Sequence, residues 1–396
     1  MAEWQTVRLG EIVKTNQSTY SPKENWQFVN YLDTGNITMN KIDEIQNINT
    51  AKDKLPSRAR RKVKTNSIIY STVRPNQLHY GIIKKQPDNF LVSTGFTVID
   101  VNYDKAVPDF IYYALIKQEV TEQLQAIAEQ SVSAYPSLKP SDIENLELML
   151  PDKKTQERIV AILRSIDEKI KENNAINNNL LEQTLTLYAT QFSSLELNGY
   201  IGDYCSVKSG FAFKSSWWTN SGIRVIKIGS INQDNLNLLE CSYVDEDKAD
   251  KAKDFVVKAG DLLIAMTGAT IGKFAMVPYS SDVLLVNQRV GKFFLGNNPV
   301  EKLPFIYCTL KQPEVYGEVV NRGQGSAQPN ISASDIMSIP CVIPSQDAIN
   351  DFNNTSQPLF DLIIRNQREN QNLSALRNAL LPKLMSGELD VSDTEI

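Results

Sequence analysis

Basic side chains are concentrated in one stretch of the first half of the chain. Between Lys52 and Lys85, ten lysines and arginines stand against a single acid, Asp53, although the whole chain carries a net charge of −5. Local charge matters more than net charge for binding a polyanion, so this stretch could contact phosphate groups. A solvated basic loop is the alternative for any one of these residues. The candidate phosphate contacts are Arg58, Arg60, Arg61, Lys62, Lys64 and Lys84.

The turn after the β-rich run 67–73 carries a different set of polar side chains. Arg74, Asn76 and Gln77 offer the donors and acceptors that the edges of nucleobases require, since arginine suits guanine and amides suit adenine. Tyr80 follows in the same segment and is a further candidate. His79, the only histidine of the chain, is equally suited to a structural hydrogen bond. We therefore expect base-reading residues in this turn.

Polar and aromatic candidates also occur outside this stretch. Gln288 and Arg289 are adjacent and combine both base-reading types of side chain, with an ion pair to a neighbouring carboxylate as the alternative for Arg289. Trp217 stands beside Trp218, and one ring could stack on a base or sugar, or both could cover the hydrophobic core. The remaining candidates are Tyr135, Lys139, Lys214, Thr270, Lys273 and Gln324.

Several chemistries are disfavoured by what the sequence lacks. A single histidine removes most Ser-His-Asp and multi-histidine metal sites. The four cysteines are far apart and form no CxxC pair, so neither a metal site nor a disulfide framework is expected. No dinucleotide-binding Gly-x-Gly-x-x-Gly, P-loop or Asn-Pro-Pro-aromatic methylation motif is present, so we expect no cofactor and no catalysis. No apolar run approaches the length of a membrane span, and we expect a cytoplasmic protein with no membrane partner.

The chain repeats itself at about half its length. The tripeptide Ser-Asp-Ile at 141–143 recurs at 334–336, and Pro151 recurs as Pro344, each 193 residues later. Each copy has the pattern of mixed α and β structure, with short antiparallel strands and, in the first copy, a helix from Asp109 to about Gln130. The loops between matching segments differ. A duplicated scaffold with unlike loops should act in the same way on two different targets.

A long polar helix follows each copy. In the first helix, apolar residues recur with coiled-coil spacing from Ile159 to Ile170, and asparagines then interrupt the seam. We expect the helices to pack antiparallel, so that the asparagines form a buried amide layer that fixes the register; a solvated face is the alternative. Pro358 predicts that the second helix starts afresh near Gln357. The asparagines of the layer are Asn173, Asn177, Asn366 and Asn370.

Three features together resemble the specificity (S) subunit of type I restriction-modification systems. The sharpest is the segment 376–390, LRNALLPKLMSGELD, which is similar to the closing sequence of that family. The second is LMLP at 148–151 followed by QERIV at 156–160, echoed weakly at 342–349. The third is the two-copy layout with unlike loops. The resemblance covers nearly the whole chain.

The resemblance implies an α+β fold with two tandem target-recognition domains, residues 1–151 and 193–344, in a pseudo-twofold repeat. Two long antiparallel coiled-coil helices, residues 152–192 and 345–396, would separate and join them. Each domain would read one half of a bipartite, asymmetric site in double-stranded DNA, and the helices would set the gap and bind methyltransferase subunits, expected to number two. Restriction subunits would complete the enzyme.

The resemblance also implies that S-adenosylmethionine, ATP and magnesium belong to those partner subunits, so that this chain binds none of them and is not a catalyst. A coiled-coil adaptor that does not bind DNA is the alternative. It would explain the helices and the acidic net charge, but not two unlike sets of basic loops on one repeated scaffold.

Overall fold

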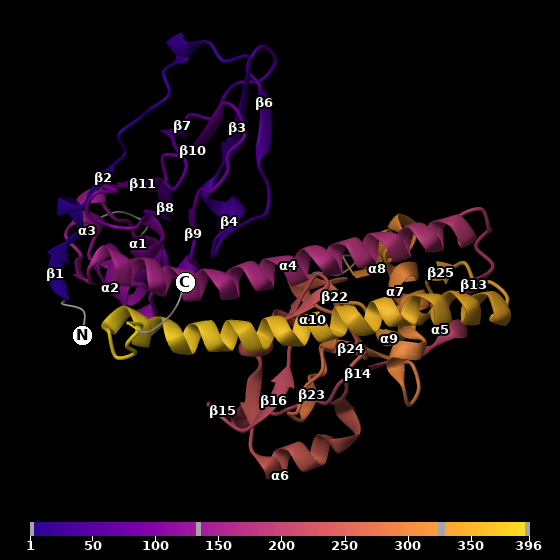
Figure 1. The fold of residues 1–396 in the computed structure, drawn as a ribbon. Coiled ribbons are helices and arrows are strands. Elements are labelled where there is room, and N and C mark those ends of the chain that lie inside the picture. The colour runs from indigo at the N-terminus through magenta and orange to yellow at the C-terminus, as the bar shows by residue number, and fades with distance from the viewer. Residues whose placement is uncertain (1–3, 132–135, 324–328, 393–396) are drawn as a thin grey trace. The chain divides into compact units, whose positions relative to one another are not determined.

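The computed structural model describes residues 4–131, 136–323 and 329–392 and divides into two units. The first unit comprises Met1–Asp167 and Ala375–Ile396, and the second comprises Glu168–Ser374. Two long helices, α4 (Lys153–Phe192) and α10 (Gln346–Ser386), each belong to the first unit at one end and to the second at the other (Figure 1). The boundary between the units therefore falls inside these helices and not at their ends.

The first unit combines short strands with three short helices. Its helices are α1 (Pro108–Leu115), α2 (Gln118–Glu129) and α3 (Pro140–Glu144). Its strands are β1 (Gln5–Arg8), β2 (Val13–Thr15), β3 (Phe28–Leu32), β4 (Ile37–Thr38), β5 (Lys41–Ile42), β6 (Gln46–Asn49), β7 (Ala59–Lys62), β8 (Ile68–Ser71), β9 (Tyr80–Ile82), β10 (Phe90–Ser93), β11 (Phe96–Val101) and β12 (Glu147–Leu150).

These strands form two four-stranded sheets and two smaller pairs. One sheet is antiparallel throughout and has the order β2–β11–β8–β9. The other has the order β6–β3–β10–β7, in which β3 and β10 run parallel and the other pairs antiparallel. The pair β1–β12 and the hairpin β4–β5 complete the unit.

The second unit has a matching set of elements. Its short helices are α5 (Ile201–Tyr204), α6 (Glu246–Ala249), α7 (Leu303–Leu310), α8 (Pro313–Gly323) and α9 (Ala333–Met337). Its strands are β13 (Gly199–Tyr200), β14 (Ser206–Ser209), β15 (Trp218–Thr219), β16 (Ile223–Ile226), β17 (Ile231–Asn232), β18 (Asn235–Leu236), β19 (Ser242–Val244), β20 (Val256–Val257), β21 (Leu262–Ala265), β22 (Phe274–Met276), β23 (Leu284–Val286), β24 (Val290–Phe294) and β25 (Pro340–Cys341).

The sheet topology of the second unit repeats that of the first. The antiparallel sheet β14–β24–β21–β22 corresponds to β2–β11–β8–β9. The sheet β15–β19–β16–β23–β20 corresponds to β6–β3–β10–β7 with one added edge strand, and its parallel pair, β16 and β23, corresponds to β3 and β10. The predicted duplication of one α+β scaffold is therefore confirmed.

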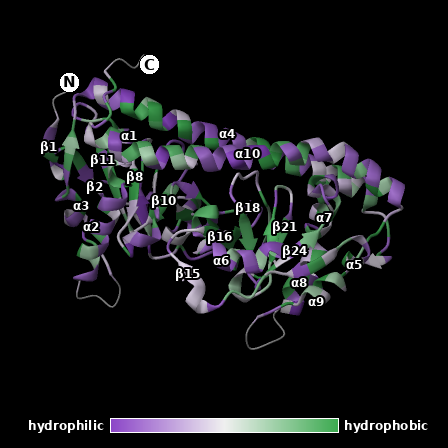
Figure 2. Cartoon of the chain, turned by 90° about the horizontal axis from the view of Figure 1, so that it is seen from below, coloured by the Kyte–Doolittle hydropathy of each residue, from purple (hydrophilic) through white to green (hydrophobic). Residues whose placement is uncertain are grey.

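The ends of α4 and α10 are built into the cores of the units. In the first unit, Leu163 near the start of α4 shares a buried cluster with Leu384 near the end of α10. In the second unit, Phe192 at the end of α4 shares a cluster with Phe352 near the start of α10. The start of one helix meets the end of the other in both units, so the helices pack antiparallel, as predicted. Hydrophilic and hydrophobic residues are interspersed along both helices (Figure 2), as amphipathic helices require.

Asparagine side chains join the two helices within the second unit. Asn173 Nδ2 donates to Asn370 Oδ1 at 3.0 Å, and Asn366 Nδ2 donates to Asn177 Oδ1 at 2.8 Å. Asn173, Asn177 and Asn366 are buried, whereas Asn370 is half-buried and also donates to Asn174 Oδ1. The four asparagines thus form a hydrogen-bonded layer between the helices, in which each buried amide has a partner.

The helix predicted from Asp109 to about Gln130 is in fact two helices. The chain turns at Lys117, whose backbone is extended (φ −58°, ψ 142°), between α1 and α2. All eight residues of α1 are buried, whereas α2 buries a single stripe of residues. The chain bends where the helix leaves the enclosed core, a tertiary effect that helical periodicity cannot reveal.

Helix α10 continues through Pro358, where a fresh start was predicted. Pro358 is exposed, while Phe352 and Phe360 on either side of it are fully buried. A proline inside a helix loses one backbone hydrogen bond. The burial of the flanking aromatic rings, each worth about 1.5–3 kcal/mol, holds the helix together across that loss.

The hydrogen bonds of the asparagine layer predict how substitutions in it change the free energy of unfolding. Asn366→Leu should lower the free energy of unfolding by about 1–3 kcal/mol, because the buried Oδ1 of Asn177 loses its donor. The double variant Asn177→Leu/Asn366→Leu should recover much of that loss, because both polar partners are then removed. Urea unfolding of the unaltered chain, Asn177→Leu, Asn366→Leu and the double variant measures the coupling. Asn178→Leu, at an exposed position of α4, is the control and should change stability by less than about 0.5 kcal/mol. Strictly additive effects would show that the layer does not couple the helices.

The position of Pro358 inside α10 predicts that its replacement changes the free energy of unfolding. Pro358→Ala should raise the free energy of unfolding by about 1–3 kcal/mol, because alanine restores the missing N–H and fits the helix better. Ser165→Ala, at the corresponding place in α4, should change it by no more than about 0.5 kcal/mol. Thermal and urea unfolding would measure both. A loss of stability in Pro358→Ala would show that the packing around α10 requires the proline ring.

Candidate nucleic-acid interface

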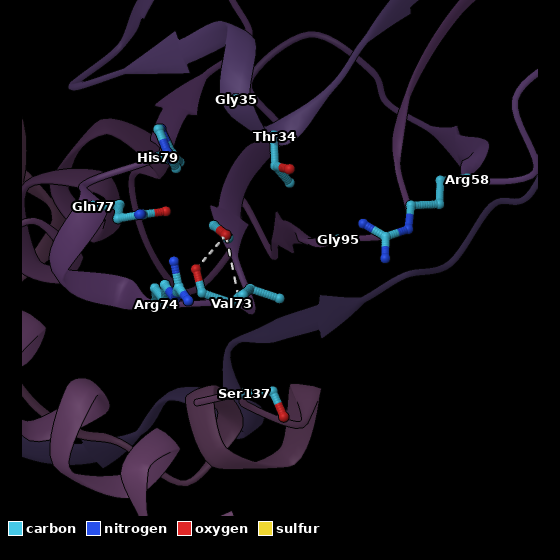
Figure 3. Close-up of a pocket in the computed structure, with 10 residues that line it drawn as sticks. Thr34, Gly35, Arg58, Val73, Arg74, Gln77, His79, Gly95 and Ser137 are labelled. Carbon is cyan, nitrogen blue, oxygen red and sulfur yellow. Dashed lines mark hydrogen bonds between the residues drawn. The ribbon is translucent and has the colours of Figure 1, made fainter. Parts of the chain in front are cut away.

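A cavity of about 470 Å³ lies beside the turn that carries Arg74 and Gln77 in the first unit. Figure 3 shows Arg58 on one side of it and Arg74, Gln77 and His79 on the other. The lining residues include two guanidinium groups and several neutral donors, and none of them is acidic. Such a lining suits an anion. The residues that line the cavity are Thr34, Gly35, Arg58, Ser71, Val73, Arg74, Gln77, His79, Gly95 and Ser137.

The backbone of Arg74 has an unusual conformation. Its dihedral angles (φ 48°, ψ 70°) lie in the left-handed region, which costs a residue with a side chain about 1 kcal/mol or more relative to glycine. The Arg74 N–H donates to the Pro136 carbonyl at 3.1 Å, and the Gln77 N–H donates to the Arg74 carbonyl at 2.9 Å, closing the 3₁₀ turn Pro75–Gln77. The turn is thereby fixed with Arg74 at the wall of the cavity.

The second unit places glycine at this position. Gly268 also has a left-handed backbone (φ 72°), and its N–H donates to the Pro329 carbonyl at 3.0 Å, as that of Arg74 does to Pro136. The two backbones are therefore equivalent, but only the first unit has a side chain there. The first unit has arginine at a position where the second unit has glycine, although the left-handed backbone favours glycine. Strained positions of this kind occur at functional sites.

Two further residues shape the wall of the cavity. His79 Nδ1 lies 2.6 Å from the Ile37 carbonyl oxygen, so Nδ1 donates to it and the ring is fixed. Asp33 precedes the lining residue Thr34 and accepts from the Thr34 N–H at 2.8 Å and the Tyr31 hydroxyl at 3.0 Å. Burial alone would raise the pKa of Asp33, but hydrogen bonds from Thr34, Ser93 and Tyr31 and the nearby charge of Arg58 lower it. Asp33 is therefore ionised and offsets part of the charge of Arg58.

Several cations predicted to contact phosphate have acidic partners. Lys62 pairs with Glu24, and Lys64 Nζ lies 3.7 Å from an oxygen of Asp100. Lys84 Nζ lies 2.6 Å from Asp109 Oδ2, which Arg164 also approaches at 3.0 Å. These three lysines have compensated charges, and Lys84 serves a structural network in the first unit. Their charges are therefore less available to a phosphate group than the sequence alone indicated.

The remaining candidates of the first unit differ in exposure. Arg60 is half-buried, and its Nε donates to the Ser57 carbonyl at 3.4 Å. Arg61 is half-buried, its Nε has no hydrogen-bond partner within the described part of the chain, and burial lowers its pKa. Asn76 and Lys139 are exposed, at the turn beside the cavity and at the start of α3.

Tyr80 does not have the predicted role. Only 6% of the residue is exposed, and its ring stacks on Tyr70 with centroids 5.7 Å apart. Burial raises its pKa to about 12, so the ring is a neutral core residue. Every residue of β9 is buried, so neither face of this strand is exposed, and a buried ring cannot contact DNA. Tyr135 and Gln324 lie outside the described residues.

Gln288 and Arg289 are exposed between β23 and β24 in the second unit. No carboxylate of a described residue lies within 4.0 Å of the Arg289 guanidinium, so the alternative of an ion pair is not realised within residues 4–131, 136–323 and 329–392. The Arg289 carbonyl accepts from the Met266 N–H, as the Gly95 carbonyl accepts from the Thr72 N–H. Arg289 therefore occupies the position that Gly95 holds at the cavity of the first unit.

Thr270 and Lys273 flank the turn that follows Gly268. Both are half-buried, and the Thr270 hydroxyl donates to the Thr267 carbonyl at 3.3 Å. The Lys273 N–H donates to the Thr270 carbonyl at 3.0 Å. These contacts hold the turn and leave the ammonium group of Lys273 without an ion pair among the described residues.

Trp217 and Trp218 cover the core, and the ammonium groups of several lysines lie close to their rings. Both rings are half-buried against the cluster that contains Phe213 and Val225. Around them, Lys227 Nζ lies 3.7 Å from the centroid of Trp218, and the Nζ atoms of Lys214, Lys248 and Lys251 lie 5.2–5.9 Å from that of Trp217. Sequence reasoning missed Lys248 and Lys251, because only the pairing of β15 with β19 brings the segment after β19 beside the tryptophans.

No helix in the described part of the chain is long and apolar enough to cross a membrane. Likewise, no group of three or more His, Cys, Asp or Glu side chains suited to a metal ion occurs among residues 4–131, 136–323 and 329–392. The four cysteines are buried free thiols.

Comparison with known proteins agrees with this architecture. The sequence profile of the family described as "Type I restriction modification DNA specificity domain" matches residues 1–182 and 198–361. The chain belongs to this family of DNA specificity proteins. It is 24% identical to the type I restriction enzyme HindI specificity subunit of Haemophilus influenzae, with 98% of this chain and 100% of that protein covered. It is 26% identical to the MjaIX specificity subunit of Methanocaldococcus jannaschii, with 79% and 76% covered.

One solved structure shows the same fold, and another is similar over nearly the whole chain at a lower score. The S subunit of a type I restriction-modification system from M. genitalium matches with a TM-score of 0.54 at 16% identity, and 97% of this chain and 96% of that chain are covered. A second S subunit, from Thermoanaerobacter tengcongensis, aligns over 98% of this chain and 97% of that chain at 20% identity and a TM-score of 0.42.

The backbone strain at Arg74 can be tested by stability alone. Arg74→Gly should be more stable than Arg74→Ala by about 1 kcal/mol, because only glycine adopts the left-handed backbone without cost. The control is the same pair of substitutions at Arg58, where φ is not positive and alanine should be the more stable replacement. Urea unfolding of the four variants measures the difference in stability between glycine and alanine at each position. Equal stabilities for the two Arg74 variants would show that the position is unstrained.

Proposed function

We propose that this chain is the DNA-recognition subunit of a type I restriction-modification enzyme. Each repeated domain reads one half of a bipartite, asymmetric site in double-stranded DNA. The single observation that best supports this proposal is that one backbone framework, present twice, carries different polar side chains at equivalent positions. The first unit has Arg74 and Gly95 where the second has Gly268 and Arg289. Two readers of different sequences, built on one scaffold, require this kind of difference.

The residues divide into two proposed roles. Three exposed amides and one exposed arginine in the loops are proposed to contact base edges, because these side chains discriminate bases by paired hydrogen bonds. They are Asn76, Gln77, Gln288 and Arg289. Lysines with no ion pair among the described residues are proposed to contact phosphates, namely Lys273 and, around the two tryptophans, Lys214, Lys227 and Lys251, whereas Lys248 pairs with Asp247. Phosphate contacts position the domain and base contacts specify the sequence.

The long helices have a proposed role in assembly. We infer that the asparagine layer fixes their register, that the helices set the gap between the half-sites, and that methyltransferase subunits, two in number, bind them. Restriction subunits would join the full complex in the cytoplasm. The chain itself would perform no catalysis, and S-adenosylmethionine, ATP and magnesium would act in the partners.

A coiled-coil adaptor without DNA contact is the competing proposal. The affinity of a DNA reader falls steeply as salt rises, because bound phosphates release counterions. An adaptor has no such affinity to lose. Binding of a labelled duplex to the purified complex with the methyltransferase, measured between about 50 and 200 mM salt, separates the two.

The proposed division of labour predicts the effect of Arg289→Ala. The complex of this chain with its methyltransferase should methylate a gapped, bipartite motif, read by methylation-sensitive sequencing of host DNA. Arg289→Ala should relax one half of that motif, losing about 1–3 kcal/mol of discrimination at one base pair, and leave the other half and the gap unchanged. Lys302→Ala, an exposed cation of the same unit, is the control. A motif that is independent of this chain would overturn the proposed function.

A further inference from the structure

Apart from Gln77, the residues that line the cavity of the first unit have no role in the proposed division into base readers and phosphate-binding lysines. It is concave, and two arginines from separate elements face it, Arg58 just before β7 and Arg74 after β8 (Figure 3). Hydroxyl, amide and imidazole groups of Thr34, Gln77 and His79 line the rest. Among the described residues at the cavity, the two arginines outnumber the single carboxylate of Asp33.

Concavity decides which part of a duplex could enter. Base edges lie at the floor of a groove and are reached by an element that protrudes into it. Phosphate groups stand outward on the backbone and can be received by a hollow. A guanidinium group also matches a phosphate with two parallel hydrogen bonds, and two such groups can hold one phosphate from both sides.

We propose that this cavity is a phosphodiester-binding site, in which Arg58 and Arg74 hold a DNA backbone phosphate between them. The inference rests on the proposed function and assigns Arg74 to the backbone instead of to a base. The left-handed conformation of Arg74 is what directs the turn so that its side chain reaches the cavity. The strain is retained because glycine, which fits the backbone better, has no charge to offer.

The cavity also depends on Gly95. A Cβ atom at this position would lie 2.8 Å from Thr34 Cγ2, too close without a shift of the wall. The second unit has Arg289 there and Gly268 in place of Arg74, so the same framework has an exposed arginine at one position and none at the other. The first unit therefore holds the DNA backbone by a device that the second unit lacks, and the two half-sites are bound by different means.

Salt dependence tests the assignment. The complex of the full chain with its methyltransferase would be titrated with a target duplex and with a random duplex by fluorescence anisotropy, for the unaltered chain, Arg58→Gln, Arg74→Gly and the control Lys105→Gln. Lys105 is exposed, lies outside the basic stretch 52–85 and does not line the cavity, and its Nζ donates to the Glu11 carbonyl. Each arginine variant should weaken binding roughly ten- to a hundred-fold on both duplexes. The slope of log affinity against log salt should become shallower by about one, and the methylated motif should not change. The control should match the unaltered complex.

A scan of neutral methylphosphonates along the target duplex locates the phosphate. One position in one half-site should weaken the unaltered complex, and the same position should cause little further loss in Arg74→Gly, because the partner of that phosphate is already gone. Unfolding curves show that the variants are folded, and glycine at position 74 is compatible with the backbone.

The outcomes separate this inference from the proposed function. If the unaltered complex binds DNA and no methylphosphonate position loses its effect in Arg74→Gly, the phosphate site is wrong. A relaxed base preference in Arg74→Gly with an unchanged salt slope would instead make Arg74 a base reader. If the unaltered complex binds no duplex at all, the proposed function fails together with the inference.

Discussion

The pairing of α4 with α10 is the contact on which the rest of the structure depends. Each unit completes its core with one end of each helix, as with Leu163 and Leu384 in the first unit and Phe192 and Phe352 in the second. The first unit therefore needs residues from the far end of the chain to bury its own apolar surface. Residues 375–396 belong to the first unit for this reason and cannot be regarded as a detachable tail.

The hydrogen bonds between the buried asparagines support the proposed role of this layer in fixing the register. An apolar seam tolerates sliding by a heptad, whereas a buried amide is costly unless its partner lies directly opposite. Asn173 meets Asn370, and Asn177 meets Asn366, at a single alignment of the two helices. The same alignment that satisfies the amides places the helix ends in their respective cores.

The two repeats separate what folds from what recognises. Strand order, the parallel pair at the centre of one sheet and the backbone hydrogen bonds around the turn are shared by both units. The side chains at the turn are not shared, and Arg74 shows that the difference is tolerated at a cost in backbone strain. A framework held by backbone hydrogen bonds and buried side chains leaves its loop residues free to vary, which is what readers of two different sequences need.

The sequence by itself determined the duplication, the long helices and the family, because these depend on periodicity and on local motifs. It predicted the asparagine layer with a solvated face as the alternative, and the hydrogen bonds of the structure decided between the two. It also located the turn that contains Arg74 and Gln77 and the pair Gln288–Arg289. Only the tertiary structure decided which cations have acidic partners, since Glu24, Asp100 and Asp109 are distant in the chain from Lys62, Lys64 and Lys84. It turned Tyr80 into the core, kept α10 intact through Pro358 and brought Lys248 and Lys251 to Trp217. These outcomes follow from burial and from contacts between distant segments, which are properties of the assembled fold and not of any short stretch of sequence.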